Sequence, residues 1–553
     1  MKRRTVIQGV AAAPWLASWL SGCTPPAPPS YTGGWLGDAP ARGHALRDGR
    51  TPSAACNGAN RRVSVAIVGG GIAGLSAARA LRQRGIDDFV VLELEDAAGG
   101  NSRGHTLAGI GCPLGAHYLP TPGEAATEVS DWLHEIGVAC QVHGRTVYDE
   151  RMLCHSPQER LFVPAAAGSS QPEGHWQDGL LPRATSEPAR QQYRRFAQAV
   201  REAQALGPRA FALPTLRARW NAALTALDQQ TFASWLQAHG LNDTNLLWYL
   251  DYCCRDDFGA GLAQVSAWAG LHYFASRHGF HAPVDDDAAD APDEGGILTW
   301  PQGNAWLVQH LAQPLGERLC TGRVVTRIRP GRHEVTLDAW QPAQSCIERW
   351  TAQHVIVALP LFVAARVIDA APTALQTIAP LMRYAPWLVS NLQLREPLLP
   401  RNGPPLAWDN VIASSPALGY VNAQHQSLTE VPEAQPTVLT HYWALGGNAP
   451  AELIANRQRL LQSPWQTWAQ AVLADLATAH PDLPHKVQHI DLMRHGHAMC
   501  VPTPGLRSHP ALQALAEPQG RLHFAHGDLS AYSVFEEAFT RGHLAARHLE
   551  IRS

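Results

Sequence analysis

The sequence predicts an α/β protein of two interleaved domains, and three observations lead to this prediction. The chain has 553 residues, which is too long for one ordinary domain but enough for two that share a large core. A strand, a glycine-rich turn and a helix follow one another near residue 70, and a second strand, turn and helix follow near residue 530. The long stretches between these two ends have mixed spacing, so a second domain of α+β type is expected there.

The chain opens with a segment that indicates export. Lys2-Arg3-Arg4 precedes a moderately apolar run that reaches Leu20 and is interrupted by Pro14. The run is too short to span a bilayer, so residues 1–22 are predicted to be a signal peptide. The paired arginines resemble a twin-arginine export signal.

The end of this segment, Leu20-Ser21-Gly22-Cys23, resembles a bacterial lipobox, in which Cys23 would be lipidated. The expectation is a protein that is exported in folded form by the twin-arginine route and is lipid-anchored to the membrane in the periplasm. An ordinary basic leader cut before a linker is the alternative. Residues 23–60 are rich in Pro, Gly and small side chains, and they are predicted to be a flexible tether.

A dinucleotide-binding unit of Rossmann type is predicted after the tether. Residues 63–68 form a β-rich apolar run, and Gly69, Gly71 and Gly74 follow in the spacing G-x-G-x-x-G before a helical segment that begins at Ile72 and Ala73. The first glycine permits a tight turn, the second lets the backbone approach a pyrophosphate, and the third lets helix and strand pack closely. The helix N-terminus offers free N–H groups to the phosphates.

A second strand, residues 89–92, ends in Glu93, about 20 residues beyond the turn. A carboxylate at that point can accept hydrogen bonds from ribose hydroxyls. The segment from Glu95 to Arg103, with Gly99 and Gly100 in it, then decides between FAD and NAD. It resembles the double-glycine segment of the flavin-containing amine oxidase superfamily, which nicotinamide dehydrogenases lack.

That resemblance implies an FAD-binding domain and gives roles to further residues. The double-glycine segment would wrap the pyrophosphate and ribityl chain, with Asn101 or Arg103 in the place where the family commonly has an arginine. Residues 113–119 resemble the family's glycine-alanine segment, which would place Gly115, Ala116 and His117 beside the isoalloxazine ring. His117 could equally be a packing residue.

The C-terminal segment resembles the superfamily's second flavin motif. A strand leads into Gly527 and Asp528, and a helix opens at Val534, Phe535 and Glu536. By resemblance, Asp528 would bind the ribityl chain, and the N–H groups of the helix opening would lie near flavin N1 and O2, where reduction adds negative charge. His526 stands where the family usually has glycine.

The cofactor-binding prediction therefore comprises Gly69, Gly71, Ile72, Ala73, Gly74, Glu93, Gly99, Gly100, Asn101, Arg103, Gly115, Ala116, His117, Val325, Gly527, Asp528, Val534, Phe535 and Glu536.

The predicted fold is thus a Rossmann-like FAD-binding domain interleaved with an α+β substrate domain, as in amine oxidases. The FAD-binding domain is expected to comprise residues 61–120 with 300–370 and 485–553. The substrate domain is expected to comprise residues 121–299 with 371–484.

Residues of the central segments supply the candidates for substrate contact and proton transfer. Aromatic rings and carboxylates suit an ammonium substrate, and such residues are dense in Tyr249, Asp251, Tyr252, Asp256, Asp257, Trp268 and Tyr273. His117 and His497 are candidates for proton transfer, although a packed or solvated histidine is the favoured interpretation of His497. An acidic loop around residues 285–294 is interpreted as a solvated loop that could instead attract a polycation.

The lysine content constrains the mechanism. Many amine oxidases of the superfamily hold a water at flavin N5 with a lysine, whereas the only lysines here are Lys2 and Lys486. The expectation is therefore an FAD-dependent oxidoreductase that takes a hydride from an organic small-molecule substrate, an amine or polyamine, and passes the electrons to a quinone or cytochrome. The alternatives are a desaturase or oxidase of an apolar polyene-like molecule, and an FAD-containing lipoprotein with a binding or assembly role.

Composition limits the other classes of partner. The 44 Lys and Arg residues against 47 Asp and Glu residues give a net charge of −3, so no nucleic-acid surface is expected. The ten cysteines contain no C-x-x-C pair, so no metal site is expected. One or two disulfides remain open among Cys112, Cys140, Cys154, Cys320, Cys346 and Cys500.

Overall fold

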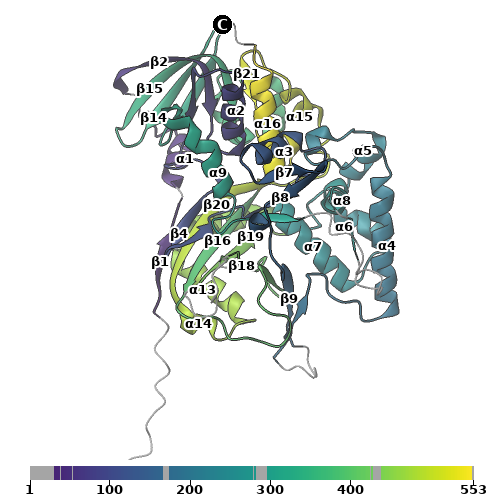
Figure 1. Ribbon diagram of the computed structural model, residues 1–553. Coiled ribbons are helices and arrows are strands. Elements are labelled where there is room, and N and C mark those ends of the chain that lie inside the picture. Colours follow the sequence, from purple (N-terminus) through teal and green to yellow (C-terminus); the bar gives the residue numbers. More distant parts are fainter. Residues whose placement is uncertain are drawn as a thin grey trace, which may run out of the picture.

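The computed structural model describes residues 30–550 except 38, 53, 166–172, 278, 282–295, 424 and 427–436. The signal peptide, Cys23 and the acidic loop of residues 285–294 lie outside the described residues. Two large sheets organise the chain, one above the other in Figure 1, and a group of helices lies beside the lower sheet.

The upper sheet has the order β12-β3-β2-β15-β14-β13, and β21 also pairs with β15. Its strands come from both ends and the middle of the chain: β2 (Ala55–Val68), β3 (Phe89–Leu92), β12 (Leu319–Cys320), β13 (Val324–Pro330), β14 (Val335–Gln341), β15 (Cys346–Val357) and β21 (Leu522–Phe524). The pairs β2·β3, β2·β15, β3·β12 and β15·β21 are parallel. These strands are buried on both faces, as crossover helices require.

Helices cover both faces of the upper sheet because alternate strand residues point to opposite sides. Val65 and Ile67 face α2 (Ile72–Gln83), α3 (Thr127–Glu135), α9 (Ala305–Ala312) and α16 (Phe535–Arg547). Ala66 and Val68 face α10 (Leu361–Val367), α11 (Thr373–Ile378) and α15 (Pro510–Leu515).

The lower sheet has the order β1-β20-β16-β19-β18-β17-β9-β10. Its strands are β1 (Thr32–Trp35), β9 (Glu159–Val163), β10 (His175–Asp178), β16 (Tyr384–Leu394), β17 (Asp409–Ile412), β18 (Tyr420–Asn422), β19 (Thr437–Ala444) and β20 (Val487–Cys500). One side packs on α12 (Pro450–Gln462), α13 (Trp465–Ala477) and α14 (Leu483–Lys486). The other side faces α4 (Glu187–Gln204), α5 (Ala222–Asp228), α6 (Phe232–Ala238), α7 (Thr244–Phe258) and α8 (Ala267–Ala275).

Small strand pairs complete the fold. They are β4 (Gly104–Leu107) with β5 (Ile110–Pro113), β6 (Tyr118–Pro120) with β11 (Ile297–Thr299), and β7 (Ala139–Val142) with β8 (Arg145–Tyr148). The β6·β11 pair matters for the site, because it fixes the segment that carries His117 and Tyr118.

The predicted tether is wrong from residue 32 onward. β1 pairs in parallel with β20, α1 (Pro40–Arg47) follows, and β2 begins at Ala55 rather than near residue 63. The side chain of Arg42 forms an ion pair with Asp96 at 2.8 Å. Glycine and proline content alone predicted a linker, but β1 pairs with the edge of the lower sheet, and Tyr31 and Trp35 pack against the core of that sheet.

The predicted domain boundaries also need correction. β20 lies in the lower sheet between β1 and β16, so residues 487–500 belong with the substrate domain and not with the FAD-binding domain. The helix α3 was assigned to the substrate domain, yet its Trp132 packs against Phe535 and Phe539 of α16 in the core of the upper sheet.

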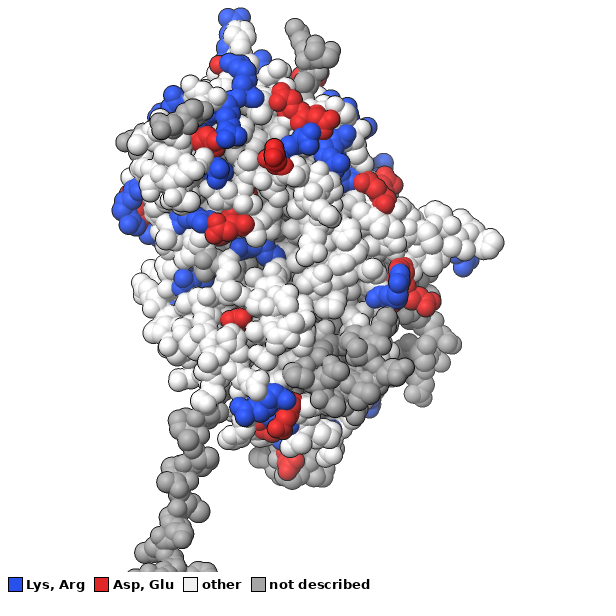
Figure 2. Space-filling model, turned by 60° about the vertical axis from the view of Figure 1, so that its left-hand side comes forward, with Lys and Arg blue, Asp and Glu red and all other residues white. Residues whose placement is uncertain are grey.

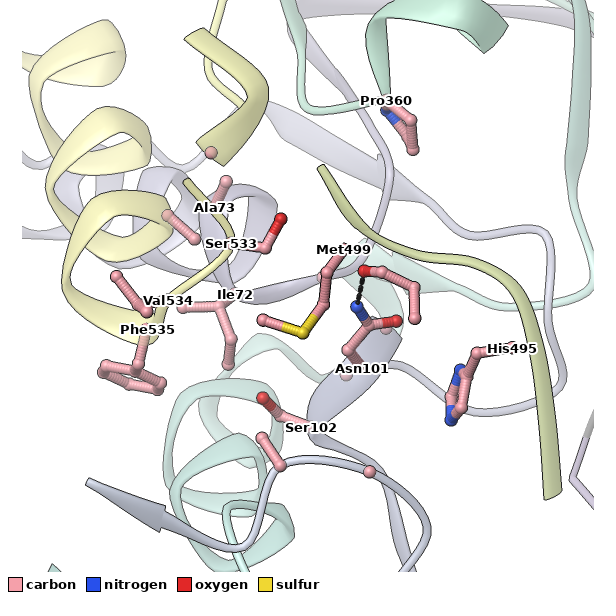
Figure 3. A pocket seen from close by; sticks show the side chains of 18 of the residues that line it. Ile72, Ala73, Asn101, Ser102, Pro360, His495, Met499, Ser533, Val534 and Phe535 are labelled. Atoms are coloured by element: carbon pink, nitrogen blue, oxygen red, sulfur yellow. Dashed lines mark hydrogen bonds between the residues drawn. The ribbon is translucent and has the colours of Figure 1, made fainter. Parts of the chain in front are cut away.

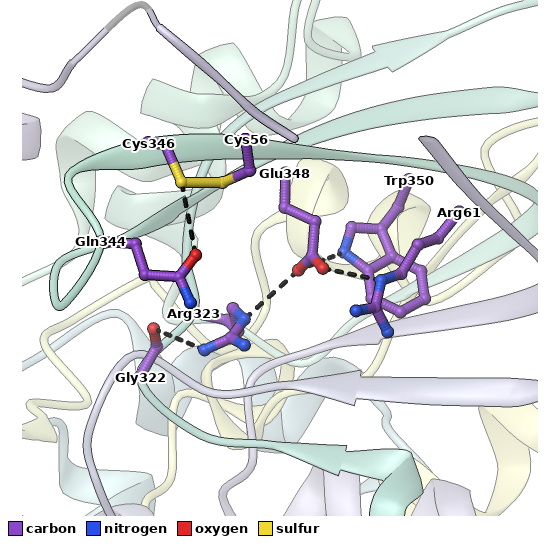
Figure 4. The surroundings of a disulfide bond; sticks show 8 residues. All are labelled: Cys56, Arg61, Gly322, Arg323, Gln344, Cys346, Glu348 and Trp350. Atoms are coloured by element: carbon purple, nitrogen blue, oxygen red, sulfur yellow. Dashed lines mark hydrogen bonds and ion pairs between the residues drawn. A yellow bond between two sulfur atoms is a disulfide. The ribbon is translucent and has the colours of Figure 1, made fainter. Parts of the chain in front are cut away.

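A disulfide joins Cys56 of β2 to Cys346 of β15, two residues 290 positions apart (Figure 4). Cys346 was among the candidates, but Cys56 was not, because it fell in the predicted tether. Cys112, Cys140, Cys154, Cys320 and Cys500 are free thiols. Near the disulfide, Glu348 of β15 forms ion pairs with Arg61 of β2 at 2.7 Å and with Arg323, directly before β13, at 3.3 Å.

Within the described residues, no helix is both long and apolar enough to cross a membrane. Those residues also bring together no group of three His, Cys, Asp or Glu side chains of the kind that holds a metal ion. On the face drawn in Figure 2, basic and acidic side chains stand next to one another, which agrees with the nearly balanced composition.

Candidate active site

A cavity of about 470 Å³ lies between the two sheets. It is lined by three stretches that are far apart in sequence: the glycine turn with the segments after β3 and β5, the strand ends of the central region, and the segment from His526 to Ala538. All of the predicted cofactor-binding residues line it except Gly74 and Arg103.

The glycine turn is shaped for close backbone approach. Gly69 has φ of +106°, and a Cβ there would lie 2.3 Å from the carbonyl oxygen of Ala358. A Cβ on Gly74 would lie 1.9 Å from the carbonyl oxygen of Gly69, so Gly74 allows α2 to pack on the turn without lining the cavity. Gly71 caps α2 with no side-chain hydrogen bond, which leaves the N–H groups of the helix N-terminus open to a phosphate.

Glu93 stands at the end of β3, beside the turn. One carboxylate oxygen accepts a hydrogen bond from the N–H of Gly70 at 2.6 Å and the other from the N–H of Glu95 at 2.8 Å. Burial raises the pKa of Glu93, although these two N–H donors oppose the shift. The remaining lone pairs of the carboxylate are available to the ribose hydroxyls of a dinucleotide.

Asn101 and Arg103 have different surroundings. The side chain of Asn101 lines the cavity and donates to the carbonyl oxygen of Ala498 at 2.5 Å (Figure 3). The guanidinium of Arg103 turns away, where it donates to the carbonyl oxygens of Gly37 and Gly100. Asn101 and Arg103 were both candidates for the position at which the family commonly has an arginine, and only Asn101 lines the cavity.

Asp528 also lines the cavity, and its two oxygens have different surroundings. Its Oδ2 accepts from the Tyr384 hydroxyl at 2.5 Å and from the Leu361 N–H at 2.9 Å. Its Oδ1 is buried and accepts no hydrogen bond, although His526 Nδ1 lies 3.2 Å from it. Burial alone would raise the pKa of this carboxyl, but His526, Tyr384 and the Leu361 N–H together lower it. Such a charged, partly unsatisfied acceptor fits a chain of hydroxyls like the ribityl group of FAD.

The helix α16 begins beside this carboxylate. Val534 is its N-cap and makes no side-chain cap bond, so the first N–H groups of the helix have no side-chain acceptor. Figure 3 shows Ser533, Val534 and Phe535 along one side of the cavity, with Met499 reaching toward Ile72 from the other. The positive end of a helix at this place favours negative charge on a bound group.

The cavity continues into a chamber of aromatic rings and acids, which we call the acidic chamber. It is lined by Tyr118, Tyr252, Asp256, Asp257, Arg277, Asp409 and Tyr442. Tyr252 and Asp256 are one turn apart on α7 and so share a face.

Of the group predicted to contact substrate, only Tyr252, Asp256 and Asp257 line the cavity. Tyr249, Trp268 and Tyr273 pack in the helical core, and Asp251 pairs with Arg255.

The two histidine candidates are not together. His117 stacks on Tyr442 with ring centroids 4.5 Å apart and lies 5.3 Å from Trp408. Burial lowers the pKa of His117 to about 3, so its ring is neutral at physiological pH. His497 instead stacks on Phe362 at 4.5 Å, near the Tyr384 that binds Asp528. Only His117 borders the acidic chamber.

Several lining residues were missed in the sequence. Asp409 comes from β17, which pairs with the distant β9, and Tyr442 comes from β19, which pairs with β16 and β18. No local motif marks either residue. Arg323 lines the cavity beside Glu93 and is held by Glu348. In the sequence, Arg323 could have been identified as a lining residue only from its position directly before the strand that contains Val325.

The family model described as flavin-containing amine oxidoreductase matches residues 72–549. The chain belongs to this family. It is an FAD-dependent oxidoreductase, and FAD is its cofactor, which agrees with the open N–H groups of α2 and the unsatisfied oxygen of Asp528.

Solved structures of family relatives have the same fold. Putrescine oxidase bound to putrescine has a TM-score of 0.62 at 17% identity, and the alignment covers 88% of this chain and 99% of that one. Cyclohexylamine oxidase from Brevibacterium oxydans IH-35A has a TM-score of 0.61 at 18% identity, with 88% and 98% covered. The predicted fold class, a Rossmann-like FAD-binding domain with a second α+β domain, is therefore confirmed.

Curated relatives match only a short part of the sequence. A Baeyer-Villiger monooxygenase from Streptomyces coelicolor is 43% identical over 68 residues, which are 11% of this chain and 13% of that protein. Polyamine oxidase 1 from Zea mays is 42% identical over 55 residues, which are 10% of this chain and 11% of that protein.

Proposed function

We propose that this oxidoreductase removes a hydride from the carbon next to the nitrogen of an amine or polyamine. The acidic chamber is the observation that carries the proposal. It opens onto the same cavity as the predicted flavin-binding residues, and it presents carboxylates and tyrosine rings together. Ammonium groups are held by this combination, through charge and through attraction to the faces of aromatic rings.

The chain's own residues would bind, orient and deprotonate the substrate. FAD supplies the hydride acceptor at N5. An amine gives up a hydride readily only when its nitrogen is uncharged, so the bound ammonium must first lose a proton. Burial, and then the charge of Asp257, raise the pKa of Asp256 to about 7, which is suited to a group that accepts a proton near neutral pH.

The neighbouring Asp257 has a different task. Arg277 pairs with it at 3.0 Å, and the Tyr532 hydroxyl donates to its other oxygen. A carboxylate that is neutralised in this way holds the chamber wall in place, because its charge is already balanced. An apolar polyene would leave the charges of this chamber without partners, and the amine proposal is therefore favoured over the desaturase alternative.

We further propose that the electrons pass to a quinone or cytochrome rather than to oxygen. The chain has two lysines, and Lys486 pairs with Asp482 at 2.8 Å in α14. The described residues that line the cavity include no lysine to hold a water at the flavin. The resemblance of the first residues to a twin-arginine signal and a lipobox supports the further proposal of a periplasmic enzyme anchored through Cys23, which would bring it close to membrane quinones.

Anaerobic stopped-flow reduction tests the function. The purified holoenzyme is mixed with monoamines, polyamines, amino acids and apolar polyenes, and bleaching of the flavin near 450 nm, roughly its visible maximum, is followed. We expect bleaching by amines. Bleaching by polyenes alone would replace this proposal with the desaturase alternative, and no bleaching by any candidate would favour a binding or assembly role.

A further inference from the structure

The carboxyl groups in and around the acidic chamber differ in whether an arginine pairs with them. Asp257 is neutralised by Arg277, and Asp251, just outside the cavity, by Arg255 at 3.0 Å. Asp256 and Asp409 line the cavity, and in the described part of the chain neither forms an ion pair with a lysine or arginine. The chamber therefore holds two carboxyl groups for which the protein supplies no counter-ion.

These two carboxyl groups act on one another. Asp256 lies on α7 and Asp409 on β17, so they face the chamber from different elements. Burial raises the pKa of Asp409 well above its usual value, and the charges of Asp256 and Glu159 add to the shift. The Tyr118 hydroxyl and the charges of Arg277 and Arg255 partly stabilise ionised Asp256. The Asn410 N–H does the same for Asp409.

The space around the pair suits an aliphatic chain. The rings of Tyr118, His117 and Tyr442 line the cavity and form one cluster with Trp408, which is buried outside the lining. The centroid distances are 4.5 Å between His117 and Tyr442 and 5.8 Å between Tyr118 and Trp408. His117 is neutral and adds no positive charge to this wall. Methylene groups can pack on these rings while charged ends reach the carboxylates.

We propose that the acidic chamber recognises a dication: an aliphatic diamine or polyamine that places one ammonium group at Asp256 and another at Asp409. A second ammonium balances the carboxylate that a monoamine would leave charged and unpaired, or protonated. This inference rests on the proposed amine oxidation and adds to it the number of charges on the substrate and the residue that meets each one.

Equilibrium binding tests the charge count without turnover. The probes are two linear alkanes of equal length, one with a trimethylammonium group at both ends and the other at one end only. Binding to the holoenzyme is followed by the shift of the flavin absorption spectrum. We expect the dication to bind at least about tenfold more tightly than the monocation at pH 8, which is above the pKa of about 7 of Asp256.

Variants assign the two charges. In Asp256→Asn and in Asp409→Asn, the dication should lose most of its advantage while the monocation changes little. Asp178→Asn, an exposed change of the same charge on β10 of the same sheet, should keep the full advantage. Each comparison is the ratio of dication affinity to monocation affinity in the same variant. A loss of folded protein lowers the signal for both probes and so does not produce the expected change in this ratio.

Turnover distinguishes failure of this inference from failure of the proposed function. Anaerobic flavin reduction is compared for a diamine and for an amino alcohol of the same length. Faster reduction by the diamine that depends on both Asp256 and Asp409 supports the inference. Equal reduction by both, or a diamine preference that both variants retain, overturns the inference and leaves amine oxidation standing; no reduction by any amine overturns both.

Discussion

The carboxylate of Asp528 illustrates how one side chain can be set up for a cofactor. Two donors hold one of its oxygens, and the other is buried and accepts no hydrogen bond, with His526 Nδ1 at 3.2 Å. We expect Asp528→Asn to weaken FAD binding by about 10- to 100-fold, because a charge-assisted hydrogen bond contributes roughly 1.5–3 kcal/mol. Fluorescence titration of the apoprotein with FAD measures this change.

Tyr384→Phe is the matched control for that variant. It removes the hydroxyl that positions Asp528 but leaves the carboxylate, so a smaller loss of FAD affinity is expected. Unchanged affinity in Asp528→Asn would contradict the role of this residue.

Asp256 predicts a pH dependence. Its pKa is raised to about 7 in the folded protein, so the carboxylate loses its charge as the pH falls through 7. The kcat/KM for an amine should therefore fall from pH 8 to pH 6, and Asp256→Asn should remove this limb of the profile. An identical profile in the variant would assign the limb to another group.

The same shift has a consequence for stability. A carboxyl with a raised pKa in the folded state opposes folding above its unfolded value near 4, and the penalty grows until the pH passes about 7. Asp256→Asn should raise the Tm of the substrate-free enzyme at pH 8 and change it less at pH 5. Such a gain in stability with a loss of activity is usual for functional carboxylates.

Local motifs predicted most of the residues of the predicted flavin site that line the cavity, and the reason is physical. Gly69, Glu93 and Asp528 stand just after strand ends beside the cavity, so their spacing is fixed by the strand, turn and helix around them. Asp409 and Tyr442 were not predictable, because the position of β17 depends on its pairing with β9, far earlier in the sequence, and that of β19 on its pairing with β16 and β18. β1 was missed for the same reason, since its strand conformation depends on β20.

At the scale of elements, two helices whose N-termini meet the cavity are packed backbone to backbone. A Cβ on Gly542 of α16 would lie 1.9 Å from the carbonyl oxygen of Ala73 in α2. Gly542→Ala must therefore move one helix, and we expect a purified protein with less bound FAD and a lower Tm. Gly43→Ala in α1, where a Cβ meets nothing within 4 Å, is the control and should be neutral or slightly stabilising.

The Cys56–Cys346 disulfide joins strands that are 290 residues apart in sequence. Closing so long a loop should stabilise the fold by about 3–5 kcal/mol, chiefly by restricting the unfolded chain. We expect a reductant to lower the Tm of the wild type. Cys56→Ser should have the lower Tm already and show no further response. An equal response in both proteins would place the effect at another cysteine.

At the scale of the whole molecule, the two sheets divide the work of one site. The upper sheet positions most of the predicted dinucleotide-binding residues, whereas the lower sheet and α7 supply most of the acidic chamber. If the electrons leave to a quinone or cytochrome, the reduced enzyme should react with oxygen at least about tenfold more slowly than with a water-soluble quinone. Stopped-flow reoxidation compares the two acceptors, and rapid reoxidation by oxygen would contradict the proposed acceptor.

The central claim is that a cationic amine reaches a bound flavin through the acidic chamber. Anaerobic titration of the holoenzyme with a diamine, followed by the flavin spectrum, tests this claim most directly. We predict full bleaching in the wild type and a rate at least about tenfold slower in Asp256→Asn and Asp409→Asn. A flavin that stays oxidised with every amine would contradict the claim. Bleaching of both variants at the rate of the wild type would contradict it as well.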